Sequence, residues 1–543
     1  MHAVEERVRS IFEEYAQPPG GVAQLLCDRH PAADVAFTSI SEDLTPADLT
    51  YGDLRASSER TATELAALGV GPGDRVATLV GKGPALLAVM LGTWRLGAVY
   101  VPLFTAFGPQ AIAMRLVDTD TKVVVTDADQ RPKLDPGPDM PAEHGWQVVV
   151  SDPSGDLGTG AKRAVPPKYA GGGEWPLVHM LTSGTTGRPK GVVHPLTYLA
   201  GWHVYLEFGL GVSRDDAYWC AADPGWAYGL YAAILGPLAL GIRSFLVSGG
   251  FSADRTMRVL ADRAITNFAA APTVYRALRS LGPATAPAVR LRCASSAGEP
   301  LTPEVNDWAR DALGTVVRDH YGQTELGMCI GNHQHPDVQR PIKPGSMGQA
   351  LPGWKVAVLR EDADEVAPAG TLGRIAVEAR ESALMTFGGY QREDDTAGKF
   401  TPDGRWYLTG DAGRQDEDGD VFFSARDDDV IIMAGYRIGP FDVESVLAQH
   451  AAVAECAVIA VPDEARGEVI EAFVVPRAPH VGRDELAEEL QQLVKERYAA
   501  YAYPRAVHFT DELPKTPSGK IQRFVLRRRR VAEMQTADGA GDL

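Results

Sequence analysis

Cysteine is scarce in this chain, and its few cysteines lie far apart. Only five occur among 543 residues, and no two stand at the spacing of metal ligands. This pattern excludes a disulfide scaffold and a zinc site built on cysteine. Reduced thiols, and therefore a cytoplasmic location, are expected.

Positive charge is also in the minority. The 53 lysines and arginines face 71 aspartates and glutamates, which gives a formal charge of −18. Such a balance disfavours nonspecific binding to nucleic acid or to an anionic membrane. Four consecutive arginines at 527–530 are the exception, and a solvated face or ion-pair partners are a better interpretation than nucleic-acid contacts.

Long apolar runs are absent. The longest apolar stretch, at 227–240, is interrupted by Gly229, Gly236 and Pro237, so it predicts buried core and no membrane span. Residues 1–14 are charged and helical in pattern, and no targeting segment is expected there.

The length and the alternation of patterns indicate the fold class. A chain of 543 residues predicts two or more domains. Short β-branched runs alternate with helical patterns, which favours an α/β architecture with largely parallel sheet. The expected strands are 75–80, 98–102, 122–126 and 243–247, and the expected buried helix is 86–96. Residues 135–173 are rich in proline, glycine and charge and predict irregular surface.

The pattern of apolar runs along the sequence changes after Asp420. Apolar runs at 421–423 and 430–433, strand-like runs at 456–461 and 472–475, and a helix that carries Leu486 and Leu490 supply a small α+β domain. We therefore expect a large multi-sheet N-terminal domain at 1–427, joined by a hinge to a small C-terminal domain at 428–543.

The segment 182–191, Thr-Ser-Gly-Thr-Thr-Gly-Arg-Pro-Lys-Gly, predicts a phosphate site. It follows an apolar run at 177–181 and combines open backbone, hydroxyl groups and two cations, all of which suit a phosphate anion. Pro189 stands where the Walker pattern requires glycine, so the common phosphate loop of motors and GTPases is disfavoured. Taken alone, the segment is also compatible with a flexible surface loop.

Four more motifs follow in order. They are Tyr-Gly-Gln-Thr-Glu at 321–325, Tyr-Leu-Thr-Gly-Asp at 407–411, Ala-Gly-Tyr-Arg-Ile-Gly-Pro at 434–440 and Pro-Ser-Gly-Lys at 517–520. Together with the phosphate segment they closely resemble the adenylate-forming superfamily of acyl-CoA synthetases, peptide-synthetase adenylation domains and luciferases. Segments 223–226, 297–300 and 343–348 are most similar to acetyl-CoA and medium-chain acyl-CoA synthetases.

The resemblance implies a two-step ligase. Members convert a carboxylic acid and ATP to an acyl adenylate and pyrophosphate, and then pass the acyl group to the thiol of coenzyme A. Cations and Mg²⁺ are needed because an anionic acid must approach a triphosphate. By resemblance, Glu325 binds magnesium and Thr324 contacts the α-phosphate. The residues expected to hold the β- and γ-phosphates are Thr182, Ser183, Gly184, Thr185, Thr186, Gly187 and Lys190.

The nucleoside contacts also follow from the resemblance. Asp411 matches the carboxylate that accepts hydrogen bonds from both ribose hydroxyls, a role suited to an acceptor-only side chain. Arg426 resembles the arginine that contacts the ribose. The adenine is expected between two segments, Gly298, Glu299 and Pro300 on one side and Asp319, His320 and Tyr321 on the other.

The C-terminal motifs imply catalysis coupled to movement. Lys520 is the catalytic candidate, expected to bridge the substrate carboxylate and the α-phosphate, and it is the family's usual target of a lysine acyltransferase and deacylase. Asp428 falls at the family's pivot, since the small domain must rotate to admit the thiol. Arg437 resembles the arginine that approaches the AMP phosphate, and Gly435 would line the coenzyme A tunnel.

Small residues suggest a roomy acyl pocket. Acetate-specific relatives carry a tryptophan immediately before Gln-Thr-Glu, whereas this chain has Gly322. We therefore expect medium-chain or aromatic acids rather than acetate. The remaining expected wall residues are Trp226, Ala227, Tyr228, Gly229 and Ala297.

Three alternatives stay open. A stand-alone ligase of the same chemistry would load a separate acyl-carrier protein, and assays with each thiol separate the two. A non-catalytic nucleotide-binding regulator is disfavoured because Lys190, Glu325 and Lys520 are all present. An ATPase motor would release ADP, whereas the ligase releases AMP and pyrophosphate.

Overall fold

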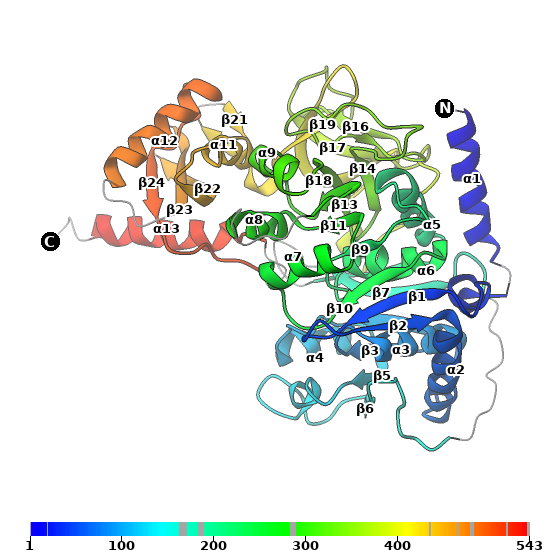
Figure 1. The fold of residues 1–543 in the computed structure, drawn as a ribbon. Helices are drawn as coiled ribbons and strands as arrows, with labels where there is room; N and C mark the ends of the chain where they lie inside the picture. The colour runs from blue at the N-terminus through cyan, green and yellow to red at the C-terminus, as the bar shows by residue number, and fades with distance from the viewer. Residues whose placement is uncertain are drawn as a thin grey trace.

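The structure is a computed structural model that describes residues 2–18, 20–161, 171–182, 189–282, 289–433, 436–463, 466–477, 483–516 and 520–539. Figure 1 shows the C-terminal elements, in orange and red, gathered on one side of the molecule, away from the blue and cyan sheet. The described strands form four sheets.

The largest sheet has nine strands within the described residues and is parallel at its centre. Its strands alternate with helices along the chain, so their carboxyl ends share one edge, where ligands bind in such sheets. In spatial order the strands are β15 (Gln349–Ala350), β14 (Gly327–Gly331), β13 (Val317–Gln323), β12 (Cys293–Ala297), β11 (Asn267–Ala270), β9 (Tyr218–Cys220), β10 (Ser244–Val247), β1 (Val35–Ile40) and β2 (Pro46–Thr50).

A second, mostly parallel sheet has six described strands. The predicted strands at 75–80, 98–102 and 122–126 are confirmed here, and the one at 243–247 in the larger sheet. Most of the described part of 135–173 is irregular, as predicted, except for an edge strand at 147–150 that pairs with β5. The order is β6 (Gln147–Val150), β5 (Thr121–Thr126), β3 (Arg75–Leu79), β4 (Val99–Pro102), β7 (Pro176–Thr182) and β8 (Lys190–Pro195).

A third, antiparallel sheet carries the Thr-Gly-Asp motif. Its four described strands are β16 (Val356–Leu359), β17 (Gly373–Glu378), β18 (Trp406–Gln415) and β19 (Val421–Arg426). Asp411 on β18 stands directly opposite Arg426 on β19.

The C-terminal elements surround a hydrophobic core of their own, with buried residues between Ile431 and Leu526. The strands are β20 (Ile431–Met433), β21 (Tyr436–Ile438), β22 (Val453–Asp463), β23 (Gly467–Pro476) and β24 (Ala506–Phe509), and the helices are α11 (Pro440–Leu447), α12 (Arg483–Arg497) and α13 (Arg523–Gly539). Arg527 and Arg530, from the basic run, lie on α13 and pair with Glu468 and Glu471. The domain boundary at 427/428 stays a prediction.

The remaining helices cover the sheets. The predicted helix at 86–96 is confirmed, and all of it after Pro84 is buried. Thr50 caps the helix that follows it, since its side chain accepts from Asp53 while the Asp53 carboxylate accepts from the Thr50 backbone. The helices are α1 (His2–Ala16), α2 (Tyr51–Ala67), α3 (Pro84–Arg95), α4 (Pro109–Asp118), α5 (Tyr198–Val204), α6 (Gly236–Leu240), α7 (Ala253–Asp262), α8 (Pro272–Ser280), α9 (Pro303–Ala312) and α10 (Glu393–Thr396). In the described segments, no helix is long and apolar enough to cross a membrane.

Candidate active site

Two residues of the predicted phosphate segment are antiparallel partners. Thr182 at the end of β7 pairs with Lys190 at the start of β8. Backbone pairing therefore holds the two flanks of the segment side by side. Ser183, Gly184, Thr185, Thr186 and Gly187 lie outside the described residues, and their predicted roles stay predictions.

Lys190 reaches the predicted magnesium ligand through Tyr390. The Lys190 ammonium lies 5.0 Å from the centre of the Tyr390 ring and donates to the Asp395 carbonyl at 3.2 Å. The Tyr390 hydroxyl donates to Glu325 Oε1 at 2.5 Å. Glu325 is buried, and a single tyrosine thus links it to the phosphate segment.

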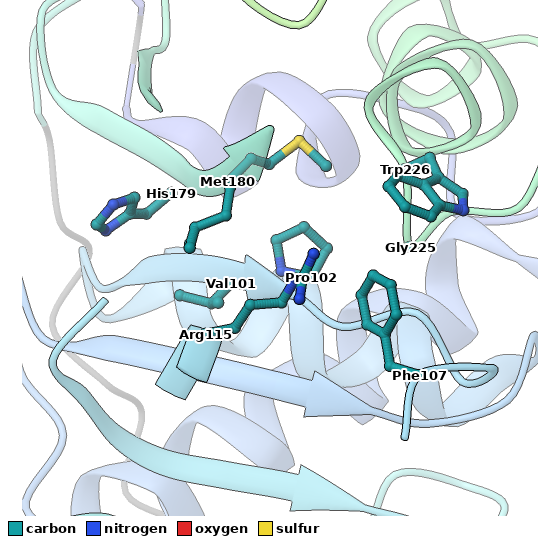
Figure 2. A pocket seen from close by; sticks show the side chains of 9 residues that line it. Val101, Pro102, Phe107, Arg115, His179, Met180, Gly225 and Trp226 are labelled. Carbon is teal, nitrogen blue, oxygen red and sulfur yellow. The ribbon is translucent and has the colours of Figure 1, made fainter. Parts of the chain in front are cut away.

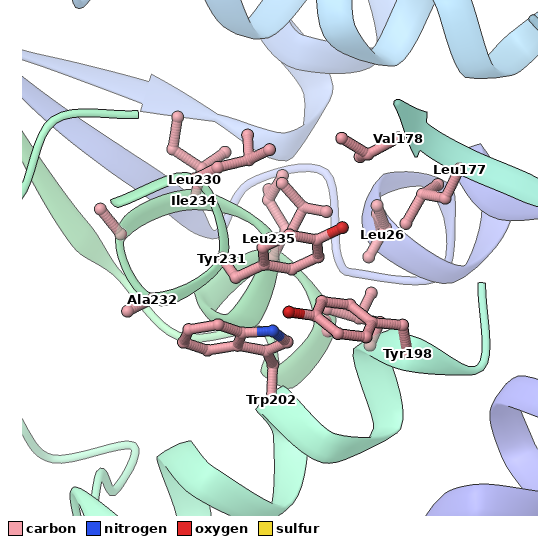
Figure 3. Close-up of a cluster of buried hydrophobic side chains, with 14 of the residues drawn as sticks. Leu26, Leu177, Val178, Tyr198, Trp202, Leu230, Tyr231, Ala232, Ile234 and Leu235 are labelled. Carbon is pink, nitrogen blue, oxygen red and sulfur yellow. The ribbon is translucent and has the colours of Figure 1, made fainter. Parts of the chain in front are cut away.

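The backbone beside Glu325 is anchored in the hydrophobic core. The Thr324 carbonyl accepts hydrogen bonds from His194 Nε2 at 2.7 Å and from the Tyr198 hydroxyl at 2.9 Å. Because the Thr324 carbonyl can only accept, the His194 proton lies on Nε2, and the Tyr231 hydroxyl donates to Nδ1 at 2.8 Å. Burial lowers the pKa of His194 to about 3, so the ring stays neutral. Figure 3 shows Tyr198 and Tyr231 in this cluster, beside Trp202.

Asp411 sits at the centre of a polar network. Its Oδ2 accepts from Gln323 Nε2 at 2.9 Å and from the Tyr321 hydroxyl, and Arg426 Nε lies 3.6 Å from its Oδ1. The side chain is buried, and loss of hydration raises its pKa although Arg426 and the two hydrogen bonds oppose the shift. The predicted ribose-binding carboxylate is therefore held rigidly by three neighbours.

Lys520 of the C-terminal region is exposed, and the charges of this network act on it. It keeps contact with solvent, but enough protein surrounds it that loss of hydration lowers its pKa. Glu299 and Asp411 attract its charge, and Arg426 repels it. Its backbone is tied to Thr516, whose Oγ1 accepts from the Lys520 amide at 3.1 Å and whose amide donates to the Lys520 carbonyl at 2.8 Å.

The predicted adenine neighbours lie on adjacent strands. Gly298 follows β12 with a φ of +97°, and no atom lies within 4 Å of where its Cβ would stand. Glu299 pairs with Arg276 at 3.1 Å. Pro300 follows directly, and the Leu301 amide donates to Asp319 Oδ2 at 3.3 Å, which ties this turn to β13. Burial raises the pKa of Asp319 to about 8.

His320 and Tyr321 continue β13 toward the Gln-Thr-Glu motif. The Tyr205 hydroxyl donates to His320 Nδ1 at 2.9 Å, and His320 Nε2 donates to the Asn332 carbonyl at 3.2 Å. Burial lowers the pKa of His320 to about 3. The ring is thus neutral and fixed.

Arg437, the predicted contact of the AMP phosphate, has another partner in this structure. Arg437 pairs with Glu361 at 3.1 Å, so its cation is not joined to the Asp411 network. The backbone of Asp428 forms one 3₁₀ turn, Asp427–Asp429, between β19 and β20. Gly435 lies outside the described residues.

Two predicted acyl-pocket aromatics face different surroundings. Trp226 packs against Phe104 and Phe107, at centroid distances of 5.5 and 5.4 Å. Tyr228 contacts Trp202 at 5.9 Å, and its hydroxyl lies 3.0 Å from that of Tyr205. Figure 2 shows the small pocket beside Trp226, which is lined by Val101, Pro102, Phe107, Arg115, His179, Met180, Leu181, Gly225 and Trp226.

The small residues predicted to widen the acyl pocket have different surroundings. A Cβ on Gly322 would stand 2.1 Å from the Gly327 carbonyl oxygen, and one on Gly229 would stand 2.0 Å from that of Asp223. Both glycines thus permit a close approach of backbone. Ala227 is half-buried against the main core, and Ala297 is buried at the end of β12.

The comparisons with known proteins agree with this geometry. A sequence profile described as AMP-binding enzyme matches residues 26–390, and one described as AMP-binding enzyme C-terminal domain matches 442–520. The chain belongs to the AMP-binding enzyme family.

Named members of the AMP-binding enzyme family resemble the chain over most of its length. It is 35% identical to an acetyl-coenzyme A synthetase of Bacillus subtilis, over 88% of this chain and 84% of that one. The crystal structure of an acyl-CoA synthetase of Brucella canis is 42% identical, covers 95% of this chain and 96% of its own, and has a TM-score of 0.72. A benzoate CoA ligase of Burkholderia xenovorans is 28% identical, covers 96% and 99%, and has a TM-score of 0.79.

These matches fix the class of reaction. The chain is an AMP-forming acid–thiol ligase with acyl-CoA synthetase activity, and ATP, Mg²⁺ and coenzyme A serve this family. The adenylate-forming resemblance and the multi-sheet α/β fold with a C-terminal α+β part are confirmed. This class of reaction argues against the two alternatives of a non-catalytic regulator and an ATPase motor.

Sequence reasoning missed several polar residues of the site. Tyr390, Gln323 and Lys399 were not singled out, although Tyr390 and Gln323 contact Glu325 and Asp411. Gln323 lies inside a motif and could have been found there. Tyr390 and Lys399 stand in a segment whose pattern predicts only a loop, so the sequence carried no signal for them.

Proposed function

We propose that the chain activates medium-chain or aromatic carboxylic acids in preference to acetate and transfers them to coenzyme A. The observation that carries this proposal is Gly322, which stands where acetate-specific relatives carry a tryptophan. The small pocket beside Trp226 adds apolar and aromatic side chains, together with the polar Arg115 and His179. An apolar wall gains about 0.8 kcal/mol for each CH₂ it buries, so the preference is graded with chain length. The similarity to a benzoate CoA ligase supports the aromatic class, whereas the similarity to an acetyl-coenzyme A synthetase is the argument for acetate that the test below must answer.

We propose the following roles around the nucleotide. Lys190, Thr182 and the loop between them bind the β- and γ-phosphates. Asp411 accepts hydrogen bonds from the ribose, with Tyr321 and Gln323 holding it in place. Gly298, beside which the structure is open, and Asp319 flank the adenine.

Mg²⁺ fits the site through Glu325. Within the described segments, no group of three or more His, Cys, Asp or Glu side chains could hold a metal by itself. Mg²⁺ at phosphate sites is usually bound by one or two carboxylates together with the phosphates, so a single glutamate suffices. Tyr390 donates to Glu325 Oε1 and fixes the orientation of the carboxylate. When bound, the ion neutralises phosphate charge as the adenylate forms.

Lys520 serves the first half-reaction. Its charge approaches the Asp411 and Glu299 side chains in this arrangement, where it can bridge the acid carboxylate and the α-phosphate. The second half-reaction then needs the C-terminal domain to turn about Asp428, which removes Lys520 and brings Arg437 and Gly435 toward the site. Acylation of Lys520 by a lysine acyltransferase removes its charge and stops the first step.

A separate acyl-carrier protein is the alternative thiol. Its phosphopantetheine arm carries the same reactive thiol as coenzyme A, so the acid pocket does not separate the two. Thioester assays that offer each thiol in turn to the loaded enzyme decide between them.

The test of the acid class is the ratio kcat/KM for acyl-CoA formation. The panel contains straight-chain acids from acetate to dodecanoate, and benzoate. We expect medium-chain acids or benzoate to exceed acetate at least ten-fold, and Trp226→Ala to shift the preference toward longer acids. Trp308→Ala, a partly buried tryptophan on α9, is the matched control. A wild-type preference for acetate contradicts the proposal.

A further inference from the structure

Lys399 lies beside the Thr-Gly-Asp motif, just after α10. Its carbonyl accepts from the Leu408 amide at 2.8 Å, which holds its backbone against the first part of β18. Its Nζ lies 3.7 Å from the point where a Cβ on Gly410 would stand, next to Asp411. The same ammonium lies 5.8 Å from the centre of the Tyr407 ring. The half-buried side chain therefore points at the nucleotide site.

The charges around Lys399 are those of the nucleotide site itself. After loss of hydration, Glu325 has the largest effect and attracts the Lys399 ammonium, as does Asp411, whereas Arg426 and Lys190 repel it. Loss of hydration, the largest influence, lowers the pKa of Lys399. Among the described residues, none accepts a hydrogen bond from its Nζ and none lies within ion-pair distance of it.

A half-buried ammonium group without a hydrogen-bond acceptor reduces the stability of the folded protein. It has lost part of its hydration and gained only the weak attraction of one aromatic face. The two nearby carboxylates already bind other groups, Glu325 the Tyr390 hydroxyl and Asp411 the side chains of Tyr321 and Gln323. An anionic ligand is what this position lacks.

We propose that Lys399 is a further substrate-binding residue that contacts the pyrophosphate portion of ATP. Two observations place it at that end of the nucleotide. The first is geometric: the Lys399 amide donates to the Thr396 carbonyl at 3.0 Å, and in the same short segment the Asp395 carbonyl accepts from Lys190 at 3.2 Å and the Tyr390 hydroxyl donates to Glu325. The second is electrostatic: Glu325, the predicted magnesium ligand, and Lys190, at the flank of the phosphate segment, are among the charged groups that act on Lys399. The inference rests on the nucleotide site proposed above.

The position predicts how Lys399 acts. During adenylate formation the bond between the α- and β-phosphates breaks, and the leaving pyrophosphate gains negative charge. A cation fixed on its side of the site stabilises that charge and binds ATP more tightly. It leaves the binding of AMP, which lacks the β- and γ-phosphates, unchanged.

The test is equilibrium binding measured by calorimetry, without any acid. ATP, AMP and inorganic pyrophosphate are each titrated with Mg²⁺ into the full chain and into Lys399→Met, Lys399→Arg and the control Lys355→Met. Lys355 is an exposed lysine outside the site. We expect Lys399→Met to weaken ATP and pyrophosphate binding roughly ten-fold or more, the range of one hydrogen bond to a charged group.

The other variants and ligands complete the test. AMP affinity is expected to stay within two-fold, and Lys399→Arg is expected to recover most of the ATP affinity. Unchanged ATP affinity in Lys399→Met overturns the inference, and an equal loss for AMP overturns the pyrophosphate placement. A wild-type chain that does not bind ATP contradicts the nucleotide site as a whole, which is a different failure. Thermal unfolding of each variant establishes that it is folded.

Discussion

Arg426 and Asp411 face each other across neighbouring strands, with Arg426 Nε 3.6 Å from Asp411 Oδ1. Asp411 is buried, and the guanidinium opposes the rise in its pKa that burial causes. A carboxylate that must accept hydrogen bonds needs to stay ionised. Arg426 favours the ionised form of Asp411 and so supports that role.

Removal of this cation should weaken nucleoside binding. We expect Arg426→Met to lower AMP affinity roughly ten-fold, because Asp411 then holds its charge less easily and loses its neighbour. Arg405→Met is the control, since Arg405 is exposed and pairs with Glu378 elsewhere on the same sheet. Calorimetric titration of AMP measures both. Equal affinities in the two variants would show that Arg426 does not act on Asp411.

Asp319 makes stability depend on pH. Its pKa is about 8 in the folded chain and 3.8 in the unfolded one, so the folded state keeps the proton that the unfolded state loses. This contribution to stability is complete below pH 3.8 and falls as the pH rises toward 8, with a slope of at most about 1.4 kcal/mol per pH unit. Asp319→Asn should therefore gain stability relative to wild type between pH 5 and pH 8.

Urea unfolding of both proteins across this pH range measures the difference. The same substitution at an exposed aspartate on α10, Asp394→Asn, serves as the control. A difference between Asp319→Asn and wild type that is constant with pH contradicts a raised pKa at Asp319.

Arg523 holds the C-terminal region together. Its Nη2 and Nε donate to the two oxygens of Glu444, at 2.7 and 3.0 Å, and Glu444 is buried. Arg523→Met leaves that carboxylate unpaired and should cost about 3–5 kcal/mol. Arg527→Met, which breaks the more exposed pair with Glu468, should cost about 1 kcal/mol or less.

Hydrogen exchange of the amides in β22 and β23 reports the stability of this region directly. The double variant Arg523→Met, Glu444→Leu should recover much of the loss, because it buries no unpaired charge. Arg523→Met that exchanges as slowly as Arg527→Met would refute the prediction.

Gly322 should not tolerate a side chain. A Cβ there would stand 2.1 Å from the Gly327 carbonyl oxygen, at the point where the pairing of β13 with β14 shifts register. We expect Gly322→Ala to destabilise the chain by about 1–3 kcal/mol or more. Gly250→Ala, with nothing within 4 Å of its Cβ and a permissive backbone, should be neutral or slightly stabilising. Thermal unfolding compares them, and equal midpoints would contradict the close approach.

The sequence predicted those strands and helices whose own residues carry a clear hydrophobic pattern. The apolar runs of β3, β4, β5 and β10 and the buried helix α3 each carry their own signal. The edge strand β6 did not, because its residues are half-exposed or exposed and it is held by pairing with β5.

The candidate site also has a part that the sequence predicted and a part that it did not. The motifs gave Glu325, Asp411 and Lys520, because each stands in a short run with a chemical reason, and the family resemblance gave Arg426. The contacts that orient them come from distant segments, such as Tyr390 to Glu325 and His194 to the Thr324 carbonyl. Such pairs depend on how sheets pack, which one sequence does not display.

The most direct measurement follows the two half-reactions separately in wild type and in Lys520→Ala. One assay records acid-dependent pyrophosphate release from ATP, and the other records thioester formation from a supplied acyl adenylate and coenzyme A. The account predicts that Lys520→Ala loses the first activity by at least a hundred-fold and keeps the second within a few-fold. Lys515→Ala, whose cation pairs with Glu455 on the surface, should keep both. A Lys520→Ala enzyme that still releases pyrophosphate at the wild-type rate would contradict the central claim that this lysine serves adenylate formation.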